Sequence, residues 1–372
     1  MKSVRKVISL LLVVLMTASL FCTAVSAATL SDLISKAIGD AETAIANGGT
    51  DNSNTTGKDT GSTLAAAEPS KTVVTITVPT GTTITSPGKT DYTADGTANP
   101  LYIQGGGGSL YLPNTAAATA YLFGDFSSAG TTITVGSGWT VYIGNADVNG
   151  KTVPTSVTAD TSAGGNVYAI KASGGSIIHL ESGKITANTV NSGASNIQCN
   201  AYGVYLDGAS TLFMGRQLTT AYTEGAGIFT SGTTGDFGIT ALNGSTVYLR
   251  QGQVYSQGQH ATAVYADNSS VTSDIAGVMG TQQDVVFYAH TANASANTAL
   301  NITGTASTSV NWRITGCGAV FEGNTALSAA VASTQTGPLA GGTFRAIGGG
   351  TAIYTGGYGS IRGALAQNYY LR

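Results

Sequence analysis

The sequence predicts an all-β solenoid, a rod in which coils of short strands stack on one another. Three observations support this fold class. Glycine accounts for 51 of the 372 residues and charged residues for only 9%, whereas a typical soluble domain has about 25% charged residues. From residue 71 onward, short runs of β-branched and aromatic residues alternate with polar ones. Similar sequence units also recur at intervals of 23 to 36 residues, which is the range of one solenoid coil.

Residues 1–27 form a predicted secretory signal peptide. A positively charged start (1–6) precedes an apolar run from Ile8 to Phe21, and small residues at 25–27 provide a cleavage site. The apolar run is too short for a membrane span. We therefore expect a secreted protein that is extracellular or attached to a bacterial cell surface. The whole chain has a formal net charge of −3, and loss of the three basic residues of the signal leaves −6.

Residues 28–70 are expected to form an amphipathic helix followed by a flexible linker. Apolar side chains recur every three or four residues between about 31 and 47, where the Asn-Gly-Gly at 47–49 ends the pattern. Residues 48–70 are rich in Gly, Ser and Thr and nearly devoid of large apolar side chains, which is typical of linkers. We expect the helix to cap the end of its own domain. The alternative is that it binds a partner molecule or the cell envelope.

The remaining residues, 71–372, are predicted to form one β-solenoid domain. No stretch of ten residues in this region has the composition of a helix. The clearest strand patterns lie at 72–79, 131–135, 139–144, 176–180, 245–250 and 300–303. Clusters of Gly, Asn, Asp and Ser between the strands predict tight turns, because glycine adopts positive φ angles without steric cost.

The repeat unit contains a tripeptide of a usually small residue, an apolar residue and usually an aromatic one. Its copies begin at Ala169, Gly203, Gly227, Ala263, Val286, Ala319 and Ala352. Aligned segments after several copies indicate about three strands per coil, and about 25 residues per coil gives about a dozen coils stacked about 4.8 Å apart. The apolar residues predicted to stack in register on one inward-facing sheet are Ile170, Val204, Ile228, Val264, Val320 and Ile353.

These repeats resemble those of the right-handed parallel β-helix proteins, the pectin-lyase-like superfamily, and of secreted bacterial surface proteins with that fold. Segments 169–187, 203–220 and 352–363 carry the resemblance, which extends over about 71–372. The resemblance implies a right-handed parallel β-helix. It specifies the fold more closely than an activity, since the family includes polysaccharide lyases, polygalacturonase-type hydrolases and many non-catalytic adhesive or structural proteins.

The sequence offers little material for catalysis. After Ser70 there are only ten Asp and three Glu, none adjacent or two residues apart, although a glycoside hydrolase needs two placed carboxylates. The Asn-Thr-Asp, Asp-Asp and Gly-His-Gly motifs of the polygalacturonase-like proteins are absent. A lyase of this fold would need an acidic calcium site beside a basic residue. No such acidic cluster accompanies the arginines Arg216, Arg250, Arg313, Arg345 and Arg362.

We therefore expect no catalytic, cofactor-binding or metal-binding residues. His179, His260 and His290 are too far apart in the sequence to form a local metal motif. The sequence also lacks a basic stripe that could neutralise a phosphate backbone, so nucleic acid is not an expected partner.

Cys199 and Cys317 are the two cysteines that remain after removal of the signal peptide. An even number of cysteines in an oxidising compartment favours a disulfide between them. The alternative is that both are small buried apolar side chains that happen to be cysteine.

The C-terminal residues Tyr369, Tyr370 and Leu371 form the predicted assembly end. No polar cap is evident there, and an uncapped solenoid end presents strand edges on which a second copy can stack. The first hypothesis is therefore a secreted, non-catalytic structural or adhesive β-solenoid that self-assembles into filaments or matrix. The alternative is a carbohydrate-binding or polysaccharide-degrading, lyase-like β-helix protein, whose partner is a polysaccharide or cell-surface ligand and in which some of the 17 tyrosines stack on sugars.

Overall fold

The computed structural model describes most of the region 101–355 together with a few flanking strands. The described residues are 75–79, 83–85, 101–148, 151–190, 198–215, 225–273, 286–305, 309–335, 337–355 and 370–371. They form strands and turns and contain no helix, which confirms the all-β prediction for this part of the chain. The predicted signal peptide (1–27) and the predicted helix and linker (28–70) lie outside the described residues and stay predictions.

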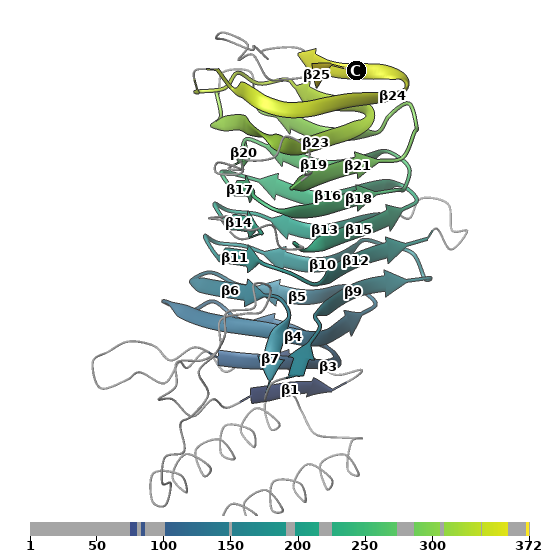
Figure 1. Cartoon of the computed structure of the whole chain (residues 1–372). Helices are drawn as coiled ribbons and strands as arrows, with labels where there is room; N and C mark the ends of the chain where they lie inside the picture. The colour runs from purple at the N-terminus through teal and green to yellow at the C-terminus, as the bar shows by residue number, and fades with distance from the viewer. Residues whose placement is uncertain are drawn as a thin grey trace, which may run out of the picture.

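The strands stack one above another along a single axis (Figure 1). In chain order they are β1 (Thr75–Pro79), β2 (Thr83–Thr85), β3 (Leu101–Leu112), β4 (Ala118–Ser128), β5 (Thr131–Val135), β6 (Trp139–Ile143), β7 (Ala146–Val148), β8 (Lys151–Val153), β9 (Ser156–Thr161), β10 (Val167–Ala172), β11 (Ile177–Leu180), β12 (Lys184–Thr189), β13 (Asn200–Leu206), β14 (Thr211–Met214), β15 (Gly227–Gly232), β16 (Gly235–Leu242), β17 (Thr246–Leu249), β18 (Gly252–Ser256), β19 (Ala261–Asp267), β20 (Ser270–Ser273), β21 (Phe287–Thr291), β22 (Thr298–Thr303), β23 (Trp312–Ala329), β24 (Leu339–Thr355) and β25 (Tyr370–Leu371). Among these strands, all except β7 and β8 belong to one hydrogen-bonded sheet.

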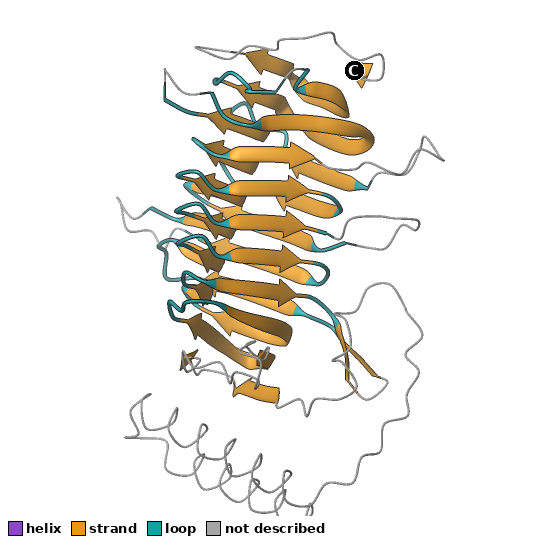
Figure 2. Cartoon of the chain, turned by 90° about the vertical axis from the view of Figure 1, so that its left-hand side faces the viewer, coloured by secondary structure: helices purple, strands orange, loops and turns teal. Residues whose placement is uncertain are grey.

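Each coil contributes a strand to each of three faces. Between β9 and β22, a strand pairs in parallel with the third strand along the chain. The β7–β8 hairpin lies between two coils, so β5 pairs with β10 and β6 with β11. Face A comprises β5, β10, β13, β16, β19 and β22. Face B comprises β6, β11, β14, β17 and β20, and face C comprises β9, β12, β15, β18 and β21. The long strands β3, β23 and β24 each run through more than one face. Figure 2 shows the resulting stack of parallel strands, which is a β-solenoid. The right-handed coil and the pectin-lyase-like relationship stay predictions.

The inward-facing residues of face A form a continuous apolar row. In register order its members are Ile133, Ile170, Val204, Ile239, Val264, Leu300, Leu327 and Ile353. Four of the six residues predicted for one sheet belong to this row. The other two lie on face C, where Ile228 pairs with Ile185 and Val254, and Val320 pairs with Tyr288.

The wrong assignment of Ile228 follows from the uneven length of the coils. The segment from Val204 to Ile228 crosses two turns within one coil and leads from face A to face C. The segment from Ile239 to Val264 completes a whole coil and returns to face A. Because the two segments have nearly the same length, spacing along the sequence cannot separate them.

The small first residue of the repeated tripeptide on face A packs directly against face C. Strand registers skip this position, which is occupied by Ala169, Gly203, Gly238, Ala263, Ala299, Ala326 and Ala352. At Gly238, a Cβ atom would lie 2.6 Å from the carbonyl oxygen of Ala263 and would collide with the side chain of Val254 on face C. At Gly203 a Cβ atom would likewise collide with Cγ2 of Ile228 on face C, so neither glycine leaves room for a methyl group, whereas the other positions in this row carry alanine.

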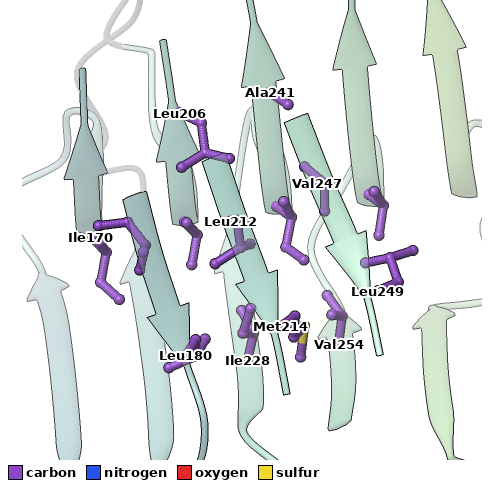
Figure 3. Close-up of a cluster of buried hydrophobic side chains, with 14 of the residues drawn as sticks. Ile170, Leu180, Leu206, Leu212, Met214, Ile228, Ala241, Val247, Leu249 and Val254 are labelled. Carbon is purple, nitrogen blue, oxygen red and sulfur yellow. The ribbon is translucent and has the colours of Figure 1, made fainter. Parts of the chain in front are cut away.

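One apolar core runs along the interior of the described coils. Figure 3 shows part of it, with Ile170, Leu212 and Leu249 contributed by different coils. Trp139 and Trp312 are its largest buried side chains. Their indole N–H groups donate to the carbonyl oxygens of Pro113 at 2.6 Å and Val331 at 3.2 Å, respectively, so both rings are buried without an unsatisfied donor.

Candidate functional site: ring ladders and a polar cluster

A ladder of six rings runs along the outer side of face B and its N-terminal continuation. Its members, on successive coils, are Tyr102, Tyr121, Tyr142, His179, Phe213 and Tyr248. Neighbouring ring centres are 4.4–4.9 Å apart and neighbouring planes differ by 6–15°. Both faces of every inner ring are therefore covered by the rings above and below, and the ladder presents ring edges to its surroundings.

His179 fits this ladder as a neutral ring. Burial lowers its pKa to about 4, and the positive charge of Arg250 contributes to the same shift. The guanidinium carbon of Arg250 lies 4.5 Å from the ring centre of Phe213 and 5.6 Å from that of Tyr248, which is cation–π distance. The imidazole consequently stacks between Tyr142 and Phe213 without a charge at neutral pH.

The hairpin formed by β7 and β8 covers the N-terminal part of the ladder. This antiparallel pair leaves the coil between β6 and β9 and lies in front of β3 and β4 in Figure 1. Phe123 of β4 and Ala146 of β7 itself are buried where the hairpin meets the coil. The partly buried side chains that pack around them are Tyr102, Tyr121, Tyr142, Val148 and Val153. The hairpin thus holds the three tyrosine rings from the side.

A shorter ladder lies on the outer side of face A. The rings of Tyr168, Tyr202 and Phe237 stack with centres 4.7 and 5.2 Å apart and planes within 4° and 9°. Tyr205 stands at 84° and 85° to the two tyrosines of the stack. The ammonium group of Lys171 lies 5.0 Å from the ring centre of Tyr168 and 5.8 Å from that of Tyr205, so a cation fills the corner between the perpendicular rings.

Face C carries a polar cluster formed by Tyr288, His290, Glu322 and Arg345. The Tyr288 hydroxyl donates to Glu322 Oε1 at 2.8 Å, and His290 Nδ1 lies 3.1 Å from the same oxygen. The Arg345 guanidinium pairs with Glu322 Oε2. His290, Glu322 and Arg345 occupy register positions on successive coils, which is why residues far apart in the sequence meet.

The electrostatics of this cluster centre on Glu322. Burial alone would raise the pKa of this carboxyl, but hydrogen bonds from Tyr288 and Arg345 and the Arg345 charge hold it below its ordinary value. Burial and the hydrogen bond to Glu322 raise the pKa of Tyr288 above its ordinary range. At neutral pH the cluster therefore consists of a carboxylate, a guanidinium and a neutral phenol, with His290 beside them.

The chemistry available to this cluster is limited by its single carboxylate. Hydrolysis of a glycosidic bond needs a second carboxyl group across the bond, and the described contacts of the cluster include no other carboxylate. Within the part of the chain that the structure describes, no group of three or more His, Cys, Asp and Glu side chains is arranged to hold a metal ion. A His–carboxylate pair beside a phenol and a guanidinium can still accept and donate protons.

A buried carboxyl lies in the interior near the corner of faces A and C. Asp236 is 0% exposed, and its Oδ2 accepts a hydrogen bond from the backbone N–H of Gly258. Its Oδ1 has no hydrogen-bond partner among the described residues. Burial raises the pKa of Asp236 to about 6, against the opposing effect of the polar groups of Thr230, Gly258 and Gln257 around it.

The structure describes one of the two cysteines proposed to pair. Cys199 is fully buried, and its Sγ lies 3.6 Å from the carbonyl oxygen of Val190 in donor geometry. Cys317 belongs to β23, but its side chain lies outside the described residues. The disulfide therefore stays a prediction.

The proposed assembly end is described in part. Tyr370 and Leu371 form β25, which pairs in parallel with Thr343 and Phe344 of β24 and so continues face C. Tyr369 lies outside the described residues. Figure 1 shows β25 and the C-terminus at the end of the stack opposite β1.

The arginines and histidines noted in the sequence have different surroundings. Arg250 lies against the face B ladder and Arg345 in the face C cluster. His260 is an exposed turn residue with a φ of 50°, and Arg313 is an exposed residue of β23. Arg216 and Arg362 lie outside the described residues. The prediction that these residue types are scattered missed the meeting of His290 with Glu322 and Arg345, which only a correct coil register reveals.

Comparisons with known proteins do not assign the chain to a family. No protein-family model, no curated protein and no solved structure matches it. In the described part of the chain, no helix is long and apolar enough to cross a membrane. The ladders, the polar cluster and the coil geometry are therefore the features from which a function can be proposed.

Proposed function

We propose that this protein is a secreted, non-catalytic structural or adhesive β-solenoid that self-assembles into filaments or matrix. The observation that carries the proposal is the ring ladder of face B, in which outward-facing rings stack on each other across six coils. Stacked aromatic pairs contribute about 0.5–1.5 kcal/mol each beyond the burial of their area. The ladder therefore stabilises the stacking of coils, which is what a scaffolding rod requires.

The same geometry argues against a sugar-binding role for the ladder rings. A pyranose binds an aromatic side chain through the face of the ring, and that face must be open. In both stacked ladders the faces of inner rings are occupied by neighbouring rings 4.4–5.2 Å away. The tyrosines thus serve coil-to-coil packing rather than a row of sugar platforms.

Self-association is supported by low charge and by the strand edges at the ends of the rod. Charged residues make up 9% of the chain, and repulsion between mature chains of net charge −6 is weak and screened by salt. Parallel strands at the end of a solenoid carry backbone groups that a further strand can pair with. A second copy that continues the coils would satisfy those groups.

Electron microscopy of the purified mature protein, beginning after Ala27, tests the proposal. Filaments or sheets with a subunit repeat matching the rod support it. Discrete rods at every concentration contradict self-assembly and leave the adhesive interpretation, which cell-binding assays would then have to support.

A polysaccharide-degrading function is the second candidate, and the face C cluster is the observation that favours it. His290 with Glu322 supplies a proton acceptor, and Tyr288 and Arg345 supply a phenol and a cation. A panel of neutral and acidic polysaccharides should be incubated with the wild type, with Glu322→Gln and with Asp160→Asn, a change at an exposed strand position. Sugar release that only Glu322→Gln loses supports this candidate. No release by any of the three proteins supports the non-catalytic proposal.

A further inference from the structure

Three pairs of tyrosine rings stack directly on one another in neighbouring coils. Their centres are 4.9 Å apart for Tyr102–Tyr121, 4.9 Å for Tyr121–Tyr142 and 4.7 Å for Tyr168–Tyr202. The planes of the rings differ by 12°, 15° and 4°, respectively. Both members of each pair lie at the same register position of adjacent parallel strands. The backbone therefore holds the two rings at the spacing of the strands, about 4.8 Å.

We propose that these stacked pairs are sites of oxidative dityrosine cross-linking between coils, driven by hydrogen peroxide and a haem-peroxidase type of oxidant. Each of the two phenols loses one electron and one proton and becomes a phenoxyl radical. The two radicals join through a carbon–carbon bond between ring positions next to the oxygens, and the two ring hydrogens move to the oxygens to restore the phenols. The two electrons and two protons reduce one hydrogen peroxide to two waters.

The arrangement of the other tyrosines makes such cross-linking selective. Tyr205 contacts Tyr168 and Tyr202 edge-on, at 84° and 85°. Tyr248 and Tyr255 stack on phenylalanine rings, which have no phenol to oxidise, and Tyr255 contacts Tyr288 edge-on, at 75°. In-register parallel stacking of two tyrosines is thus confined, among the described ring contacts, to the three pairs above.

Exposure alone would favour different tyrosines. Tyr111 and Tyr354 are 43% and 54% exposed. If access of the oxidant decided the outcome, these two would react first and would join separate molecules. Geometry predicts the opposite result, in which bonds form within one chain between rings already in contact. The β7–β8 hairpin packs on Tyr102, Tyr121 and Tyr142 of the face B ladder, so the Tyr168–Tyr202 pair on face A should react fastest.

A bond between neighbouring coils would act on stability as a disulfide does. Joining Tyr168 to Tyr202 closes the whole coil that lies between them in the sequence, and it removes conformations from the unfolded chain. Cross-linking does not depend on the proposed self-association, because both tyrosines of each pair belong to one chain. Filament formation can therefore fail without affecting it.

The test treats the folded mature protein with hydrogen peroxide and a haem peroxidase, then identifies linked peptides by mass spectrometry as pairs lighter by two hydrogens. We expect a Tyr168–Tyr202 link in the monomer and a raised melting temperature. Tyr202→Phe keeps the stacked ring and should abolish this link, whereas the matched control Tyr205→Phe should retain it. The proposal is overturned if monomers contain no such link, if Tyr205→Phe loses it to the same extent, or if the links formed join Tyr111 or Tyr354 of different molecules.

Discussion

The buried carboxyl of Asp236 makes the stability of the fold depend on pH, which the sequence did not suggest. In the unfolded chain its pKa is about 3.8, and burial raises it to about 6 in the folded chain. The folded state therefore binds the proton more tightly, so the contribution of Asp236 to stability falls as pH rises from about 4 to about 6. A pKa difference of this size corresponds to about 3 kcal/mol.

Replacing Asp236 by Asn should stabilise the protein at neutral pH. Asparagine retains an oxygen that can accept the hydrogen bond from Gly258, and it carries no charge to desolvate. We expect a higher melting temperature at pH 7 and little change at pH 4. Asp160→Asn, at an exposed position, should leave both temperatures near those of the wild type. An equal change at the two pH values would contradict burial of a titrating carboxyl.

A second prediction at the scale of the residue concerns the effect of Gly238 on stability. A methyl group there would meet the carbonyl oxygen of Ala263 at 2.6 Å, and a backbone atom cannot move aside as a flexible side chain can. Gly238→Ala should therefore destabilise the fold by about 1–3 kcal/mol, as overpacking does. Gly130 has open space around its Cβ position and no positive φ, so Gly130→Ala is the control. Denaturant unfolding of the two variants measures the difference in their stability, and equal midpoints would contradict the packing argument.

At the scale of the element, the strands were predictable and their faces were not. Alternating β-branched residues such as those at 131–135 indicate a strand whatever its neighbours are, and this strand is present as predicted. Assigning a strand to a face requires knowing how many turns separate two repeats. Ile228 was placed on the wrong face for this reason. The copies beginning at Gly238, Ala299 and Ala326 were missed, because Thr240, Asn301 and Ser328 stand where an aromatic was expected.

The candidate sites were even harder to predict from the sequence, because their residues come from different coils. Glu322 lies 32 residues from His290 and 23 residues from Arg345 along the chain. Nothing local distinguishes these three residues from other polar strand positions. The ring ladder has the same origin, since His179 and Phe213 become neighbours only when their coils are aligned.

The His179 rung of the ladder gives a prediction with the opposite pH dependence to that of Asp236. Its pKa is about 4 in the folded chain and about 6.5 in the unfolded chain. Stability from this residue is therefore fully present above about pH 6.5 and is lost as pH falls toward 4, because the unfolded chain takes up the proton first. His179→Phe preserves the stack without a titrating group.

We expect His179→Phe to raise the melting temperature at pH 5 more than at pH 8. His260→Asn is a suitable control, because the exposed turn position has a φ of 50° that asparagine tolerates. The control should show no such pH-dependent gain. A His179→Phe variant that is destabilised equally at both pH values would mean that the imidazole makes a contact that a phenyl ring cannot replace.

At the scale of the whole molecule, each coil is stabilised by packing against its neighbours. The described coils contribute core residues, rings or polar side chains to rows shared with their neighbours. In such a solenoid, total stability is close to a sum of coil terms and interface terms. In any solenoid without caps, the two terminal coils have one interface fewer than the inner coils. Association of rods through their ends would supply the missing interface, and this links the fold to the proposed assembly.

Association of rods through their ends can be tested at the C-terminal end. β25 adds to face C by pairing with β24, and Tyr369 and Leu371 belong to the sequence predicted to form the assembly end. Tyr369→Lys together with Leu371→Lys would place two positive charges between stacked subunits, where burial of an unpaired charge is costly. We expect the wild type to sediment as large assemblies and this variant as monomers with unchanged β-sheet circular dichroism.

The control for that experiment adds the same charge at the side of the rod. Tyr111 and Val190 are 43% and 49% exposed, so Tyr111→Lys with Val190→Lys introduces two lysines without burying them. This control should assemble as the wild type does, because the ends of the rod are unchanged. If both double variants lose assembly, charge alone governs association and the end-to-end geometry is wrong. A wild type that remains monomeric at high concentration would instead remove the assembly proposal and favour a protein that adheres to its ligand as a single rod.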